Sequence, residues 1–229
     1  MKFYIWEKEI EFDENTHQLK FDKRIIDPSI RTYYDMKELY YDKWDIDDDK
    51  WLYFMFRWVY LNKEDEKKFK ENNLRYDLTV IVPEIIWDEF NKTYWHYHPK
   101  KSDWTKYEEI YEVLSWTVIY LQQNDNEVKY TDAFSWDKVV MDEWFGHITI
   151  NPSDEDILVM ANIVDDSFSS EYWEYKDLKW WNYYYKTSWF EKNPNYKNDL
   201  KIVESEEFFE WWDMYEQFLE NPEKFNFLH

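Results

Sequence analysis

The chain has 229 residues and a formal net charge of −22, from 50 acidic and 28 basic side chains. This charge opposes binding to nucleic acid, which depends on neutralising phosphates, and binding to anionic membrane surfaces. Because cysteine is absent, disulfides and thiolate metal sites are excluded. The sequence contains no run of 18 apolar residues, so no transmembrane helix is predicted. The N-terminus lacks the apolar stretch of a signal peptide. A cytoplasmic location is therefore expected.

The first third of the chain predicts mixed short elements. In order, we expect an edge strand with a loop over 1–30, a short helix or ordered turn over 31–43, an acidic loop over 45–49, a strand over 51–62, and a charged, polar excursion over 63–73.

Short β-rich runs recur from residue 75 to residue 164, separated by turn signals at a spacing of roughly ten residues. The predicted strands are 76–83, 93–98, 109–114, 117–122, 138–141, 147–151 and 157–164. This pattern is typical of a sandwich or barrel, and the missing alternation of strands and helices argues against a doubly wound sheet. The sequence therefore predicts an all-β fold.

The tail predicts a helix that docks on the core and ends at Asn221-Pro222. Its apolar residues have helical spacing: Phe208, Trp211, Trp212, Tyr215, Phe218 and Leu219.

Three of the five histidines and one carboxylate form a candidate metal site: His96, His98, Glu109 and His147. Residues two apart on a strand point to the same face, so His96 and His98 can reach one ion. Imidazole and carboxylate together suit a divalent transition metal. The alternative is an exposed histidine pair on a strand edge, but the later Glu109 and His147 favour the metal.

Glycine and tryptophan occur in unusual numbers, with 1 Gly and 16 Trp. Ordinary usage would give roughly 16 Gly in a chain of this length. Several Trp lie where turns favour glycine, as in Ser115-Trp116 and Ser135-Trp136-Asp137. One hypothesis is that these Trp correspond to glycines in the natural protein, through UGA codons translated as Trp. The alternative is an aromatic-rich protein with unusual turns.

Several motifs over roughly residues 28–202 resemble the cupin-type glucose-6-phosphate isomerases. The matching segments are Ile30-Arg31 with Asp35-Met36-Lys37, T-V-I-V-P at Thr79–Pro83, W-D-E-F-N-K-T-Y-W-H-Y-H at Trp87–His98, Glu109-Ile110-Tyr111, Phe145-Gly146-His147, Glu171-Tyr172-Trp173 and N-P-N-Y-K at Asn193–Lys197. Glycines of the family fall on Trp87, Trp95, Trp116, Trp136 and Trp173.

The resemblance implies a cupin double-stranded β-helix, a jelly-roll barrel, with an N-terminal strand arm and a C-terminal helix. It implies a single cupin domain over 1–229. We expect 1–74 to form the N-terminal arm and edge strands, 75–165 the metal-binding barrel core, and 166–229 a C-terminal extension with the helix.

The resemblance also assigns roles to individual residues. The metal ligands would be His96, His98, Glu109 and His147, holding one divalent transition metal, with Fe²⁺ expected first and Mn²⁺, Zn²⁺ or Ni²⁺ as alternatives. The catalytic residues would be Glu109 and Tyr111. The substrate-binding residues would be Thr79, Thr93, Trp95 through its backbone, Tyr111 and Tyr172. The chain departs from the family at Ser170 and Val164, where members often carry histidine and tyrosine.

The implied function is a metal-dependent aldose-ketose isomerase that interconverts glucose-6-phosphate and fructose-6-phosphate in glycolysis and gluconeogenesis. Negative charge develops on the sugar oxygens during this reaction, and a divalent metal can stabilise it as a Lewis acid. A non-catalytic sugar- or metal-binding cupin is one alternative, which Ser170 and Val164 favour. A cupin dioxygenase is another, and it predicts oxygen uptake. The expected partner is a small sugar phosphate, with no nucleic acid or membrane, and a homodimer is one option for assembly.

Overall fold

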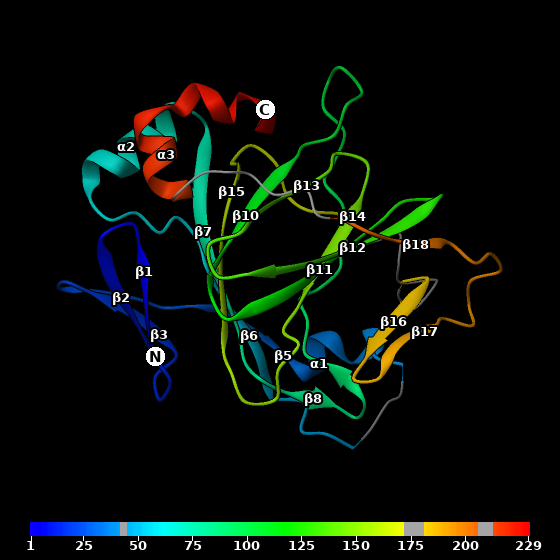
Figure 1. Ribbon diagram of the computed structural model, residues 1–229. Coiled ribbons are helices and arrows are strands. Elements are labelled where there is room, and N and C mark those ends of the chain that lie inside the picture. The colour runs from blue at the N-terminus through cyan, green and yellow to red at the C-terminus, as the bar shows by residue number, and fades with distance from the viewer. Residues whose placement is uncertain (42–44, 172–180, 206–212) are drawn as a thin grey trace.

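Two sheets enclose a barrel in the computed structural model, which describes residues 1–41, 45–171, 181–205 and 213–229 (Figure 1). The larger sheet is antiparallel and contains, in spatial order, β13 (Lys138–Met141), β10 (Glu109–Ser115), β15 (Leu158–Asp165), β7 (Leu74–Ile81), β6 (Trp51–Phe56) and β5 (Ser29–Thr32). The smaller sheet contains β14 (Gly146–Ile150), β11 (Thr117–Gln123), β12 (Glu127–Phe134) and β18 (Lys201–Glu204), and only its β12–β18 pair is parallel within the described residues. The predicted all-β jelly-roll is confirmed.

The N-terminal residues form a four-stranded antiparallel meander, where we expected an edge strand and a loop. Its strands are β1 (Lys2–Ile5), β2 (Lys8–Asp13), β3 (Gln18–Phe21) and β4 (Arg24–Ile26). The hairpins turn at Trp6, His17 and Asp22, which have φ between 51° and 56°. Such backbone usually calls for glycine, and its absence from these turns hid the hairpins from the sequence prediction.

Tryptophan dominates the left-handed backbone of this protein. Seven of the ten described residues with positive φ are Trp, and none is Gly. They are Trp6 (51°), Trp58 (54°), Trp87 (64°), Trp104 (74°), Trp116 (76°), Trp136 (81°) and Trp189 (142°). All seven side chains are exposed, by 42% to 75%, although tryptophan is a residue that is buried on average. The backbone therefore places Trp where the physical chemistry of the chain favours Gly.

Two helical segments pack together beside β7, at the upper left of Figure 1. Helix α2 (Lys63–Glu71) replaces the expected polar excursion, and it begins at Asn62, whose side chain accepts from Glu64 N and Asp65 N. Its face buries little apolar surface besides Phe69, so helical periodicity was weak in the sequence. Phe69 stacks on Phe218 of α3 (Met214–Glu220), with ring centroids 4.0 Å apart.

The predicted C-terminal helix is present as α3, while Phe208, Trp211 and Trp212 lie outside the described residues. Pro222 does end it, but a 3₁₀ helix, η2 (Pro222–Leu228), follows at once. The predicted short helix near residue 31 is α1 (Tyr33–Met36) followed by η1 (Lys37–Leu39). None of the helices in the described part of the chain combines the length and apolarity that a membrane span requires.

Two further differences concern strands. A small sheet was not expected, with the order β17 (Trp189–Lys192), β16 (Tyr183–Lys186), β9 (Glu89–Phe90) and β8 (Ile85–Ile86). The predicted strand 93–98 is an extended segment held by isolated bridges, His96 to His147 and Tyr97 to Glu171. Because the bridges are isolated, this segment has little of the ladder that fixes a regular strand.

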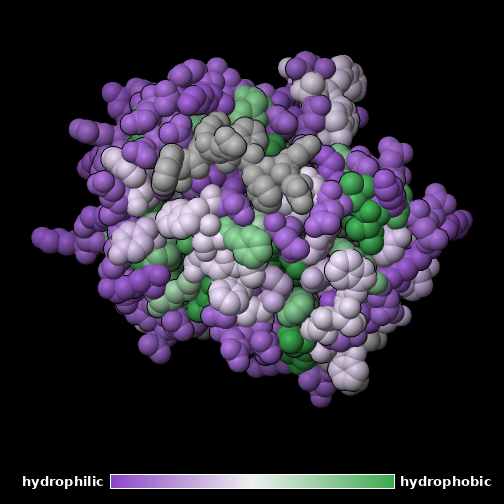
Figure 2. Space-filling model, viewed as in Figure 1, coloured by the Kyte–Doolittle hydropathy of each residue, from purple (hydrophilic) through white to green (hydrophobic). Residues whose placement is uncertain are grey.

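Buried apolar side chains form two clusters, one inside the barrel and one between the larger sheet, the N-terminal meander and the helices α2 and α3. The second cluster joins Phe3, Leu78 and Met214, so it draws on all three segments into which the sequence was divided. Hydrophilic side chains line much of the periphery of the molecule in Figure 2, as the high charge requires. The division of the chain as a single domain stays a prediction.

Candidate active site

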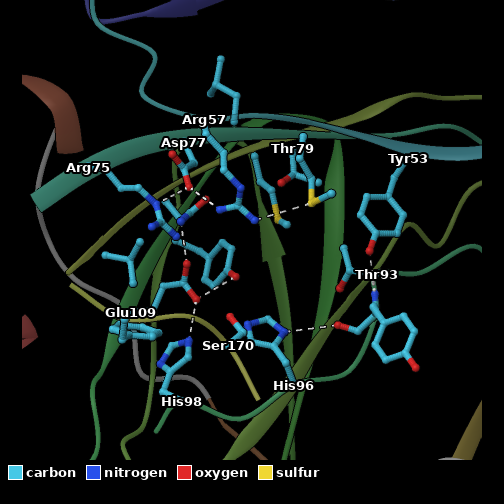
Figure 3. A pocket seen from close by; sticks show the side chains of 18 residues that line it. Tyr53, Arg57, Arg75, Asp77, Thr79, Thr93, His96, His98, Glu109 and Ser170 are labelled. Carbon is cyan, nitrogen blue, oxygen red and sulfur yellow. Dashed lines mark hydrogen bonds and ion pairs between the residues drawn. The ribbon is translucent and has the colours of Figure 1, made fainter. Parts of the chain in front are cut away.

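The register of the larger sheet stacks polar side chains on its inner face. Side chains opposite one another in an antiparallel pair share a face, and so do residues two apart on a strand. The rows across β10, β15 and β7 are Glu109–Val164–Arg75, then Tyr111–Asn162–Asp77, then Val113–Met160–Thr79. These rows form one wall of a cavity inside the barrel (Figure 3).

The four candidate metal ligands meet beside this wall. His147 lies on β14, and the bridge between His96 and His147 places the extended segment next to it. One donor atom from each of His96, His98, Glu109 and His147 lies within 4.8 Å of the other three. Glu109 Oε2 lies 3.2 Å from His98 Nε2 and 3.3 Å from His147 Nε2. Residues 51 positions apart in sequence therefore converge on one point.

Neighbouring groups fix the orientation of these side chains. His98 Nδ1 donates to the carbonyl of Tyr107 at 2.9 Å, which leaves its Nε2 toward Glu109. Glu109 accepts on both oxygens, from Asn162 Nδ2 at 2.5 Å and from the Tyr111 hydroxyl at 3.0 Å. Such contacts behind the ligands set the tautomer and ring orientation on which metal affinity depends.

Burial disfavours the protonated forms of His96 and His147. It lowers the pKa of His96 well below its usual value, and the neighbouring His147 and His98 lower it further. It also lowers the pKa of His147. Burial alone would raise the pKa of Glu109, but contact with His147 and His98 outweighs burial and holds this pKa well below its ordinary value. Neutral His96 and His147 beside an ionised Glu109 are the forms that bind metal.

The donor set fits a divalent metal. Within the described residues His147 Nε2 has only the 3.3 Å contact with Glu109, and neither ring nitrogen has a partner with hydrogen-bond geometry, although the side chain is only 2% exposed. A buried imidazole without such a partner is unusual unless another ligand satisfies it. Three imidazoles and one carboxylate suit iron, zinc or nickel better than calcium or magnesium.

The cavity brings most of the predicted substrate-binding residues together. Thr79, Thr93 and Tyr111 line it with His96, His98 and Glu109. Thr93 Oγ1 accepts from Thr149 N at 3.0 Å, which holds this side chain in place. Val164 and Ser170, where the chain departs from the family pattern, also line the cavity. Tyr172 lies outside the described residues.

Trp95 does not line the cavity with these residues. Neighbouring residues in extended backbone point to opposite faces, so its indole points away from His96. It is 1% exposed and packs on Trp181, with ring centroids 4.4 Å apart. A Cβ added to Gly146 would lie 2.2 Å from Cζ2 of this indole, so the chain's one glycine makes room for Trp95.

Sequence reasoning missed seven polar or aromatic residues of the cavity: Tyr53, Arg57, Arg75, Asp77, Tyr94, Asn162 and Phe168. The alternation of polar residues at 75, 77 and 79 was a usable signal, because it places three polar side chains on one face of one strand. Arg57 and Asn162 had no such signal, since each enters the cavity through pairing between strands distant in sequence.

Comparison with known proteins gives one match by sequence family. A family model described as Glucose-6-phosphate isomerase (GPI) matches residues 30–199. The search of curated protein sequences found no match. Similar solved structures include oxalate decarboxylase from Bacillus subtilis, 14% identical, covering 53% of this chain and 28% of that chain with a TM-score of 0.39. They also include vicilin from Capsicum annuum, 11% identical, covering 52% and 29% with a TM-score of 0.38. The chain spans less than one third of the length of these two relatives.

Proposed function

The chain belongs to the glucose-6-phosphate isomerase family, and from this premise we propose that it interconverts glucose-6-phosphate and fructose-6-phosphate with a bound divalent metal. The observation that carries the proposal is the convergence of His96, His98, Glu109 and His147 beside a cavity lined by Thr79 and Thr93. When bound, the metal would supply Lewis-acid stabilisation of the charge that develops on the sugar oxygens. We propose Fe²⁺ first, with Mn²⁺, Zn²⁺ and Ni²⁺ as alternatives.

Glu109 and Tyr111 are the proposed catalytic residues. Both line the cavity, and the Tyr111 hydroxyl donates to Glu109 Oε2 at 3.0 Å. Because the pKa of Glu109 is held low, its carboxylate stays ionised and accepts from the Tyr111 hydroxyl, which fixes that side chain in the cavity. This pair can hold or move a proton within hydrogen-bond reach of a sugar oxygen. Replacing Tyr111 with Phe should lower kcat while the protein keeps its metal.

The direct test is a coupled isomerase assay on chelated and metal-reloaded protein. Chelation should abolish turnover, and Fe²⁺ or Mn²⁺ should restore it. His98→Ala should lose both the metal and the activity. His17→Ala is the matched control, because His17 packs on Phe54 and neither residue lines the cavity. Full activity in metal-free protein would overturn the proposal.

A second candidate function is a non-catalytic sugar- or metal-binding protein. Val164 and Ser170 favour it, because the resembling family often has tyrosine and histidine at these two positions of the cavity wall. Valine and serine offer fewer groups for catalysis there. This candidate predicts metal and sugar-phosphate binding without turnover. A dioxygenase, by contrast, predicts oxygen consumption with an organic substrate.

We further propose that the protein acts in glycolysis and gluconeogenesis in the cytoplasm, where sugar phosphates are metabolised. A small sugar phosphate is its proposed partner, and nucleic acid and membranes are not. A homodimer is the proposed assembly, and light scattering of the metal-loaded protein tests it.

A further inference from the structure

Two of the four arginines of the chain line one cavity. Arg57 follows β6 and Arg75 lies on β7, with side chains 37% and 14% exposed. Among the described residues that line this cavity there is no lysine, so Arg57 and Arg75 are its Lys or Arg side chains. In a protein of net charge −22, an anion needs local positive charge of this kind to bind.

Asp77 orients both guanidinium groups. Its Oδ2 accepts from Arg57 Nη1 at 2.9 Å and from Arg75 Nε at 2.8 Å, and its Oδ1 accepts from Trp58 N at 3.0 Å. Arg75 also pairs with Asp166 at 3.2 Å, so two carboxylates hold it. Arg57 makes one of these ion pairs, and a guanidinium carries five N–H donors. Arg57 therefore keeps donor capacity for a ligand.

The strand pairing places Arg57 near Thr79, and Thr93 lines the same cavity. Met55 of β6 pairs with Thr79 of β7, and Arg57 follows Met55 by two residues, on the side of Asp77. Thr93 lines the same cavity from the facing segment (Figure 3). A guanidinium beside hydroxyl donors is the chemistry that recognises a phosphate monoester, since Arg binds phosphate oxygens bidentately.

We propose that Arg57, oriented by Asp77, binds the phosphate group of the substrate together with Thr79 and Thr93. This inference rests on the proposed function, and it makes Arg57 the residue that selects phosphorylated over unphosphorylated sugars. The phosphate does not react, so Arg57 binds it equally in the ground state and in the transition state. Loss of such uniform binding raises KM and leaves kcat unchanged.

The test measures binding of inorganic phosphate to metal-loaded protein by calorimetry at fixed ionic strength, with isomerase kinetics alongside. Arg57→Gln should weaken phosphate binding at least tenfold and raise KM for glucose-6-phosphate, with kcat close to that of the wild type. Arg24→Gln is the matched control, because it makes the same change in net charge, and Arg24 bonds the Tyr60 carbonyl away from the cavity. It should bind phosphate as the wild type does.

Arg57→Lys is the second variant, because it keeps the charge beside Asp77 while losing the bidentate fork. It should fold and bind phosphate with intermediate affinity. If Arg57 were only structural, the variants would lower the thermal midpoint and leave phosphate affinity unchanged, which would overturn the inference.

The two proposals fail separately. If the wild-type protein binds phosphate through Arg57 yet does not isomerise glucose-6-phosphate, the proposed function is wrong and this inference stands. If the wild type isomerises the sugar phosphate but Arg57→Gln binds phosphate unchanged, the function stands and this inference is wrong.

Discussion

Glycine at three turn positions should stabilise the protein. Trp87, Trp116 and Trp136 have φ of 64°, 76° and 81°, and their side chains are 57%, 43% and 46% exposed. A non-glycine residue in this left-handed region costs about 1–2 kcal/mol, whereas glycine costs about 0.5–1 kcal/mol in backbone entropy. Because exposed indoles contribute little burial, each Trp→Gly change should gain about 0.5–1 kcal/mol.

The combined variant should therefore unfold at a higher temperature. A gain of about 1.5–3 kcal/mol corresponds to a rise in Tm of roughly 3–12 °C for a chain of this size. Trp116 and Trp136 lie in neighbouring turns, where Ser135 Oγ donates to the Trp116 carbonyl at 3.1 Å. Their gains can couple, so both single variants and the pair must be measured.

Differential scanning calorimetry is the assay, and Trp51→Gly is the matched control. Trp51 is 44% exposed but lies on strand β6 outside the left-handed region, so glycine there should lower Tm. If the triple variant is no more stable than the starting protein, or if Trp51→Gly gains as much, the argument from backbone conformation is wrong. Reading the coding DNA is an independent check, and UGA codons are expected at the positive-φ Trp positions.

Three further predictions concern buried contacts. Burial raises the pKa of Glu112 to about 7. The contribution of Glu112 to the free energy of unfolding is therefore full below pH 4.5 and is lost as pH rises through 7. The loss amounts to about 3 kcal/mol. The double variant Glu112→Gln with Lys138→Met, which removes the whole buried ion pair, should therefore flatten the pH dependence of unfolding between pH 4.5 and 7, and an unchanged slope would contradict this. Asn162→Ala removes the donor to Glu109 Oε1 and should weaken metal affinity by roughly 10–100-fold in chelator competition, whereas equal affinity would show that this contact positions nothing. Phe218→Ala should destabilise the packing of α3 on α2 by about 3–5 kcal/mol in urea titration, and an unshifted midpoint would mean that the tail contributes no stability.

Most strands of the barrel were predictable because their residues alternate or form apolar runs between turn signals, but β12 and β18 were missed. β7, β10, β11 and β15 all follow this rule. The small sheet was not predictable in the same way, because β8 and β9 have two residues each and depend on contacts distant in sequence. Helix α2 was missed because a helix with one buried aromatic side chain has almost no apolar periodicity.

The candidate metal ligands were predictable because histidine is rare in this chain and its spacing is informative. Arg57 was not predictable as a cavity residue, since it lies 18 residues before Arg75 and reaches Asp77 only through the pairing of β6 with β7. A charged residue on the inner face of a barrel strand contradicts the usual pattern of apolar interiors. Such conflicts between local pattern and burial concentrate at functional sites.

The scarcity of glycine at turns explains the missed hairpins, and the tryptophans at such positions carry the argument for glycine. Turn prediction relies on Gly, and the N-terminal hairpins turn at Trp6, His17 and Asp22 instead. Seven Trp in the left-handed region would together cost about 7–14 kcal/mol, whereas a whole domain is usually stable by only about 5–15 kcal/mol. A chain with so much backbone strain should be marginally stable, and glycine relieves the strain without changing any residue of the cavity, because none of the seven lines it. The fold and the site are therefore compatible with glycine at these turns, and stability, not activity, is the property that glycine should restore.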